Sequence, residues 1–354
     1  MIEIVKLNSG NEKENAERIV RSLRDYSCVI IQDPRTTAKD NDAFISAMES
    51  YFNQKESVKM NDARPNMNYQ IGYTPAKQEI SRGIKSEKCA KYISNLTEEN
   101  KCALPKKNQP DLKSRFFWRI GSRPENTQFP DLNGKKQVIP KGIPDFEETM
   151  NKWGNSLMET LRSVIILLGI GLKYELRLPK NDEEIAQEFL DLIKDAPHLL
   201  APTGSCLRNA KRGDILAGIH ADMNFLTIHG KSNFPGLEIW DKNGKKIRMS
   251  IPEDCLLIQA GDQLEICTGG YIKAGYHQVT VTEATEYAIE RKRLLHSKEK
   301  HLNKPFCPWR VSSTLFCHVA SDLRLKNLIA ETDDNEKGIL SGDYIKQHLK
   351  DINL

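Results

Sequence analysis

Three short patterns in the second half of the chain combine residues that can hold a metal ion and a carboxylate. They are His220-Ala-Asp222, a separate His277 and Arg310-Val-Ser312. Side chains two residues apart on a strand point to the same face, so His220 and Asp222 can share one ion, and His277 can add a third ligand from another strand. Two imidazoles and one carboxylate on one face of an octahedron leave three positions open, which is typical of non-haem Fe(II) sites.

The Arg310-x-Ser312 pair predicts a carboxylate clamp. Arginine presents a planar fork that binds a carboxylate through two hydrogen bonds, and a hydroxyl two residues later lies on the same strand face. The His-x-Asp pattern alone is weak because the chain has eight histidines, and a lone His277 is better explained as a structural histidine on a strand than as a metal ligand. A metal-dependent hydrolase would explain the three metal ligands and leave Arg310 and Ser312 without a role.

Helices with short strands between them are expected in the first half of the chain. Apolar residues recur at helical spacing over residues 12–26, about 40–60 and about 144–168, and we expect Gly169 and Gly171 to end the third helix. The apolar run Cys28-Val-Ile-Ile between the first two helices predicts a short buried strand.

After residue 200 the pattern changes to short strands separated by turn residues, among them Asn243-Gly244, a strong hairpin signal. The strands are expected at 205–208, 225–229, 237–240, 247–251, 255–259, 263–267, 277–281 and 310–319. About eight strands at this spacing predict a jelly roll or barrel. The charged segment 282–303 interrupts them and is expected to be helical.

Composition limits the classes of protein that the chain can represent. Of 354 residues, 39% are hydrophobic and 28% charged, which is ordinary for a globular protein. The net charge of +4 is too small to indicate a nucleic-acid partner. No apolar run is long enough to span a membrane and no secretory leader is recognisable, so we expect a cytoplasmic protein. Eight cysteines without a C-x-x-C pair favour neither a zinc ribbon nor a disulfide framework.

The chain resembles the isopenicillin N synthase-like Fe(II)/2-oxoglutarate-dependent dioxygenases over about residues 1–322. The residues that carry the resemblance are Gly218-Ile-His-Ala-Asp-Met-Asn-Phe-Leu-Thr-Ile, Phe234-Pro-Gly-Leu-Glu-Ile-Trp, the stretch from Leu256 to Tyr271 and, more loosely, Gln70-Ile-Gly-Tyr-Thr-Pro and Trp118-Arg-Ile-Gly-Ser-Arg-Pro. The resemblance implies a mixed α and β fold, with a double-stranded β-helix (jelly roll) core flanked by N-terminal helices and a long backbone helix.

It also divides the chain into three regions. Residues 1–140 would form the N-terminal helix and strand region, residues 141–330 the jelly-roll core with the long helix, and residues 331–354 a C-terminal helix or tail. An insertion at about 283–308 separates His277 from Arg310 more widely than is usual in the family, and it is a candidate lid or substrate wall. A surface helix without function is equally consistent with it.

The resemblance implies the roles of the site residues. His220, Asp222 and His277 would hold Fe(II), while Arg310 and Ser312 would bind the far carboxylate of the cosubstrate 2-oxoglutarate. Such enzymes use O2, couple decarboxylation of 2-oxoglutarate to oxidation of an unactivated C–H bond, and release succinate and CO2. Ascorbate is an additive in their assays.

Many relatives carry a tyrosine before the first ligand strand that helps to bind 2-oxoglutarate, and this chain has Leu207-Arg-Asn-Ala-Lys-Arg there. Asn209 or Lys211 could substitute for that tyrosine. Further candidates, for substrate binding, are Asn224, Arg208, Arg119 and Tyr73. For each of them a structural role is the competing interpretation.

The resulting hypothesis is an oxygenase for a small, carboxylate-bearing, amino-acid-derived metabolite of natural-product biosynthesis, working as a monomer. The outcome could be hydroxylation, desaturation or ring closure. One alternative is an oxidase of the isopenicillin N synthase type, in which the substrate supplies all electrons and Arg310 with Ser312 holds its carboxylate. Another is a non-catalytic jelly roll that binds a small molecule.

Overall fold

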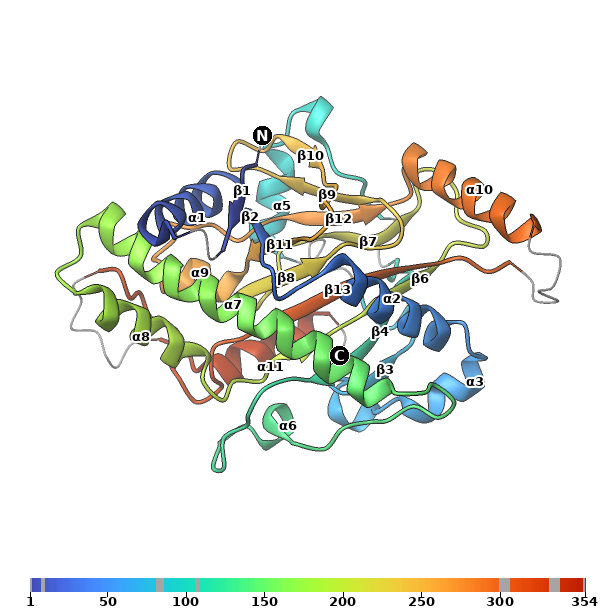
Figure 1. Ribbon diagram of the computed structural model, residues 1–354, viewed down its shortest axis with the longest axis horizontal. Coiled ribbons are helices and arrows are strands. Elements are labelled where there is room, and N and C mark those ends of the chain that lie inside the picture. Colours follow the sequence, from blue (N-terminus) through green and yellow to red (C-terminus); the bar gives the residue numbers. More distant parts are fainter. Residues whose placement is uncertain are drawn as a thin grey trace.

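Two β-sheets packed face to face form the centre of the protein, and helices cover one side (Figure 1). The computed structural model describes residues 2–7, 10–80, 86–105, 109–298, 306–330, 338–352 and 354. Its sheets and flanking helices agree with the expected mixed α and β architecture.

The larger sheet runs in the order β1-β2-β11-β8-β13-β5-β4-β3, and β6 pairs with both β13 and β4. Its strands are β1 (Ile4–Lys6), β2 (Cys28–Gln32), β3 (Gly72–Thr74), β4 (Ser114–Arg119), β5 (Leu199–Leu200), β6 (Thr203–Cys206), β8 (Leu226–Gly230), β11 (Cys255–Ala260) and β13 (Trp309–Cys317). The smaller sheet has the order β10-β9-β12-β7, made of β7 (Ile215–His220), β9 (Leu237–Trp240), β10 (Lys246–Arg248) and β12 (His277–Thr280). The chain passes repeatedly from one sheet to the other, for example from β7 to β8 and from β8 to β9, and these crossings join the two sheets into a roll.

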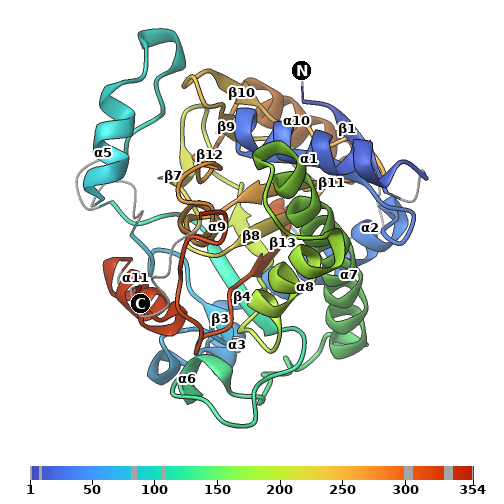
Figure 2. The same cartoon turned by 90° about the vertical axis from the view of Figure 1, so that its left-hand side faces the viewer.

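The longest helix, α7 (Phe146–Leu176), lies along the outer face of the larger sheet between α1 (Glu12–Tyr26) and α8 (Asp182–Ile193) (Figure 2). It is long and apolar enough to cross a membrane by length and composition, but 56% of its most apolar window is buried in the protein. The remaining helices are α2 (Ala38–Phe52), α3 (Glu56–Lys59), α5 (Glu87–Ser94), α6 (Pro130–Asn133), α9 (Asp262–Cys267), α10 (Glu283–Lys298) and α11 (Ser341–Asp351).

The expectation that Gly169 and Gly171 end this helix is wrong, because α7 continues through both glycines to Leu176. The glycines serve packing instead. A Cβ on Gly171 would lie 2.4 Å from the carbonyl oxygen of Ala16 in α1, and one on Gly169 would lie 3.1 Å from the carbonyl oxygen of Ile185 in α8. The missing side chains let the three helices approach closely.

Two other elements differ from the expectation. The helix expected over 40–60 ends at Phe52, whose carbonyl accepts a hydrogen bond from Nζ of Lys59 at 3.1 Å, and α3 follows after a break. The strand expected at 263–267 is the helix α9, because a short apolar run does not distinguish a buried strand from a buried helical turn.

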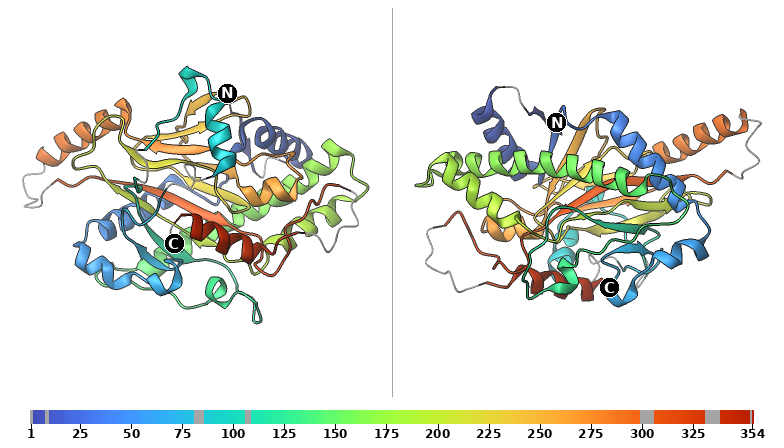
Figure 3. Two further views of the ribbon diagram at one scale, coloured as in Figure 1. Left: turned by 180° about the vertical axis from the view of Figure 1, so that it is seen from behind. Right: turned by 60° about the horizontal axis from the view of Figure 1, so that its bottom comes forward.

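The insertion expected to wall the site forms α10, which projects from one end of the molecule (Figure 1). Its first turns are anchored through the buried residues Thr285 and Ile289, and Thr285 donates a hydrogen bond to the carbonyl of Pro235 at 3.2 Å. Further along, Nζ of Lys292 lies 4.5 Å from the ring centre of Phe234. No residue of α10 lines the two cavities described below. The C-terminal helix α11 instead lies across the face opposite α7 (Figure 3).

The close contact between α7 and α1 gives a stability prediction. Gly171→Ala should lower the free energy of unfolding by about 1–3 kcal/mol although alanine favours helix, because the new methyl group overlaps the backbone of Ala16. Chemical denaturation measures the change. Asn155→Ala at an exposed position of the same helix is the control, and it should be neutral or slightly stabilising. A Gly171→Ala protein as stable as the wild type would contradict this account of the packing.

Candidate active site

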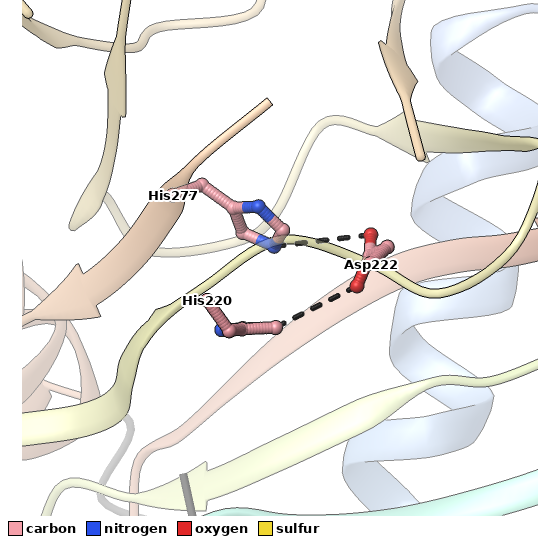
Figure 4. Close-up of side chains that lie close together, drawn as sticks. All are labelled: His220, Asp222 and His277. Atoms are coloured by element: carbon pink, nitrogen blue, oxygen red, sulfur yellow. Dashed lines mark ion pairs between the residues drawn. The ribbon is translucent and has the colours of Figure 1, made fainter. Parts of the chain in front are cut away.

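Two histidines lie opposite each other on neighbouring, paired strands of the smaller sheet. His220 is the last residue of β7 and His277 the first of the antiparallel strand β12, and their Cα atoms are direct partners. Directly opposed residues on one sheet face have side chains in contact range. The two imidazole centroids are 4.3 Å apart (Figure 4).

Asp222 completes the cluster from a turn. The expectation that His220 and Asp222 open one strand is wrong, since β7 ends at His220 and Asp222 lies in the connection to β8. Oδ1 of Asp222 is 3.6 Å from Nε2 of His220, and Oδ2 is 3.9 Å from Nε2 of His277. The three residues offer ligand atoms that all lie within 4.8 Å of one another.

Hydrogen bonds fix the orientation of all three groups. Nδ1 of His220 lies 2.7 Å from the carbonyl oxygen of Gly218, and Nδ1 of His277 lies 3.3 Å from that of Gly275. Each imidazole therefore donates from Nδ1 and turns the lone pair of Nε2 toward the carboxylate. Thr227 donates from Oγ1 to Oδ2 of Asp222 at 2.6 Å, which holds the carboxylate in place.

The charge state of the cluster suits a divalent cation. Burial, together with His220, lowers the pKa of His277 to about 3, so its imidazole is neutral. Burial alone would raise the pKa of Asp222, but His277, His220 and the hydroxyl of Thr227 outweigh it and hold the pKa below its usual range. Imidazole nitrogens and an ionised carboxylate are donors that Fe(II) takes, and the residues fit such an ion.

Arg310 and Ser312 lie in the same cavity as the cluster. Both come from β13, where they pair with Ser205 and Thr203 of β6, and the cavity that they line also contains His220, Asp222 and His277. Arg310 is buried, and its guanidinium has only long contacts, 3.4 Å from Nε to the carbonyl of Pro235 and 3.3 Å from Nη2 to Oγ of Ser232. A buried arginine with such weak partners can still take a carboxylate.

Asn209 and Lys211, the candidates to replace the tyrosine that relatives use to bind 2-oxoglutarate, lie outside the cavity of Arg310. Asn209 lines a different cavity, beside Cys206 and Trp309, and Lys211 lies in the exposed turn before β7, so neither lines the cavity of Arg310. His229 does line it, with its Nδ1 3.2 Å from Oγ1 of Thr314 and its pKa lowered to about 4 by burial. No motif in the sequence singles out His229.

Of the substrate-binding candidates, only Asn224 lines a cavity at the cluster. Arg208 lies in the cavity of Asn209. Arg119 is buried with its guanidinium on the carbonyl groups of the 131–136 loop, and Tyr73 is buried with its hydroxyl 2.9 Å from Oε1 of Glu56. Arg208, Arg119 and Tyr73 therefore line neither cavity at the cluster, and their role in substrate binding stays a prediction.

A second cavity adjoins the cluster, and most of its residues were not predicted from the sequence. His220, Asp222, Lys113 and Arg115 line both cavities. Only the second contains Glu79 and Asp111, together with apolar residues of α11, and no motif singles out any of its four charged residues Glu79, Asp111, Lys113 and Arg115. Arg115 lies on β4 and the other three lie in loops. In the sequence, the only indication of a site here is the presence of charged residues next to an apolar strand.

A jelly roll with two histidines and one aspartate at its open end defines a non-haem iron type of site. Residues 204–319, which include all three ligands and the Arg310 clamp, match the family model of the 2OG-Fe(II) oxygenase superfamily. This part of the chain is therefore similar to that superfamily, and the fold of the whole chain is similar to those of solved 2OG-Fe(II) oxygenases.

Relatives share the fold over the whole chain but the sequence only in part. A flavonol synthase/flavanone 3-hydroxylase of Petunia hybrida is 27% identical over 149 residues, 41% of this chain and 39% of its own. The chain thus spans about two fifths of the length of such curated relatives. A 2OG-Fe(II) oxygenase family protein of Caulobacter crescentus superposes with a TM-score of 0.71 at 20% identity, covering 99% of this chain and 98% of the other. A full-length protein of Neurospora crassa, solved in complex with alpha-KG, gives a TM-score of 0.69 at 16% identity, covering 99% of this chain and 96% of the other.

The geometry of the cluster predicts which substitutions abolish metal binding. Asp222→Ala and His277→Ala should each leave the purified protein with less than about one tenth of the wild-type iron after anaerobic loading, because two ligands hold the ion poorly. Metal analysis checks this. His296→Ala, on α10, is the control and should bind iron normally. Full iron content in His277→Ala would show that the site is assigned wrongly.

The hydrogen bond from Thr227 gives a finer prediction. Thr227→Val keeps the shape of the side chain but removes the donor to Oδ2 of Asp222, so Fe(II) affinity should fall about tenfold with the fold intact. Anaerobic titration with Fe(II) measures the affinity, and circular dichroism controls for folding. Unchanged affinity would mean that the carboxylate does not depend on this hydroxyl.

Proposed function

We propose that this protein is an Fe(II)- and 2-oxoglutarate-dependent oxygenase that oxidises an unactivated C–H bond of a small, carboxylate-bearing, amino-acid-derived metabolite. The observation that carries the proposal is one cavity that holds both the His220–Asp222–His277 cluster and the Arg310–Ser312 pair. A metal site alone fits many reactions. A metal site that faces a buried carboxylate clamp fits a chelating keto acid.

The residues of this cavity divide the work. His220, Asp222 and His277 would hold Fe(II), which when bound would supply the centre for reduction of O2 coupled to decarboxylation of 2-oxoglutarate. Arg310 and Ser312 would bind the far carboxylate and so fix the position of the keto acid. The apolar walls formed by Leu237, Ile251 and Val279 exclude water from the clamp, which strengthens its electrostatic attraction.

The second cavity supports a separate, charged substrate. It shares His220, Asp222, Lys113 and Arg115 with the cavity of Arg310, and either of the two cations can pair with a carboxylate. Arg310 and Ser312 line only the first cavity, whereas Glu79 and Asp111 line only the second. Two adjoining cavities leave space for a cosubstrate on Arg310 and a separate substrate, which favours this function over the oxidase alternative, in which Arg310 would hold the substrate itself.

The proposal also covers the location and oligomeric state of the protein and the type of oxidation. The protein would act as a cytoplasmic monomer in natural-product biosynthesis, and hydroxylation, desaturation or ring closure would follow from how the second cavity holds the substrate. A non-catalytic binding role gains no support from three ligand groups oriented for a metal.

Binding of 2-oxoglutarate tests the proposal directly. Anaerobic addition of 2-oxoglutarate to the Fe(II) protein should produce a weak visible charge-transfer band. Arg310→Ala should raise the half-saturating concentration about 10- to 100-fold, because it removes charge-assisted hydrogen bonds to the far carboxylate. Arg208→Ala, which changes the arginine in the other cavity, should leave it unchanged.

Two results would contradict the proposal. Iron binding without a band would favour the oxidase alternative, as would turnover of a substrate without succinate. Equal 2-oxoglutarate binding by Arg310→Ala and the wild type would show that the clamp is elsewhere.

A further inference from the structure

The second cavity contains a group of four buried or nearly buried charges, which we call the charged quartet: Glu79, Asp111, Lys113 and Arg115. Lys113 pairs with both carboxylates, at 3.0 Å from Nζ to Oε2 of Glu79 and in a short contact with Oδ2 of Asp111. Nη2 of Arg115 lies 3.3 Å from the same Oε2 of Glu79. Two acids and two bases balance, so the quartet adds no net charge to the cavity.

Internal pairing leaves two positions of the quartet open. Asp111 uses its second oxygen, Oδ1, to accept a hydrogen bond from the backbone N–H of Gly218 at 3.1 Å. Oε1 of Glu79 and Nε of Arg115 are buried, and neither has a hydrogen-bond partner among the described residues. Leaving buried charged groups incompletely paired is costly, so these two atoms are the places where a ligand gains most.

The two open atoms differ in chemistry and lie close together. Oε1 of an ionised carboxylate accepts hydrogen bonds from a cation or another donor, whereas Nε of a guanidinium donates to an anion or another acceptor. Since Oε2 of Glu79 and Nη2 of Arg115 form one ion pair, the open atoms belong to adjacent groups. A matching ligand must carry its donor and its acceptor on neighbouring atoms.

Neighbouring aromatic rings fix Arg115 and add apolar surface. Its guanidinium carbon lies 5.8 Å from the ring centre of Phe117 and 5.7 Å from that of Phe316. Both rings line the cavity, together with Ile345 and Leu349 of α11. The cavity thus has a charged end beside an apolar wall, and His220 and Asp222 lie on its lining.

We propose that the substrate is an α-amino acid or an N-alkyl derivative, whose ammonium group donates to Glu79 and whose carboxylate accepts from Arg115. The inference rests on the proposed oxygenase function and assigns recognition of the substrate to Glu79, which lines only the second cavity, and to Arg115, which lines both cavities. The α-carbon places ammonium and carboxylate next to each other, as the two open atoms require. The remainder of the substrate lies along the apolar wall toward the metal cluster.

Compounds that lack one charge test the wild-type enzyme without any substitution. The protein, loaded with Fe(II) and 2-oxoglutarate, is given the twenty common L-amino acids and their N-methyl derivatives in air, and succinate release is measured. At least one of them should stimulate release. Its N-acetyl derivative and its methyl ester should each need at least about tenfold higher concentration for the same effect, because each removes one charge.

A substitution then tests the assignment to Glu79. Glu79→Gln should raise the half-saturating concentration of the stimulating amino acid at least about tenfold and leave that of 2-oxoglutarate unchanged. Glu238→Gln is the matched control, because Glu238 is also buried and hydrogen-bonded but lines neither cavity. Thermal unfolding of each variant separates loss of fold from loss of recognition.

The outcomes separate the two proposals. Equal stimulation by the N-acetyl derivative, an unchanged response in folded Glu79→Gln, or no response to any amino acid in a protein that forms the 2-oxoglutarate band would each overturn the recognition of an α-amino acid. If Glu79→Gln does not fold, the comparison of derivatives on the wild type decides. Absence of the band itself would instead overturn the oxygenase function.

Discussion

An ionised carboxylate buried beside two imidazoles is the constraint on which the rest of the site depends. Asp222 is buried, and without partners its charge would not persist there. His220 and His277 reach it because β7 and β12 pair in register, and Thr227 binds it because β8 starts just after the turn. The pairing of β7 with β12 and the connection from β7 to β8 therefore bring the three ligands together.

The same geometry produces two adjoining cavities that share some of their residues. β13 carries Arg310 and Ser312 into one cavity, Glu79 and Asp111 line only the other, and Arg115 of β4 lines both. Each cavity keeps charged groups buried, and each leaves some of their hydrogen-bonding capacity unused. Unused capacity in a buried charged group costs stability, and it is a sign of a ligand rather than of the fold.

Helices outside the roll have more distant roles. The close packing of α7 on α1 and α8 supports the larger sheet from behind, and Gly171 shows that this support depends on small residues at the contact. α11 covers the second cavity with Ile345 and Leu349, so the C-terminal part of the described chain contributes to the site itself. By contrast, α10, the insertion between His277 and Arg310, lies away from both cavities.

The chemistry of the metal site and clamp could be predicted from the sequence because it depends on residue type at short spacing. His220, Asp222, Arg310 and Ser312 are recognisable by such local patterns, and the strand pattern predicts the roll. Local patterns could not show that Asp222 lies in a turn or that Gly171 lies within a helix, since both follow from contacts with distant segments.

The second cavity was decided by tertiary structure alone. Glu79, Asp111 and Arg115 belong to segments without a motif, and only folding brings them beside His220, more than a hundred residues later in the chain. Arg119 illustrates the converse, since it lies four residues after Arg115 on the same strand but binds loop carbonyls instead. The sequence by itself determined which metal and cosubstrate chemistry the chain can perform, because ligand type is local. The groups that meet the substrate were decided by packing, because burial and pairing of charges depend on neighbours that only the folded chain supplies.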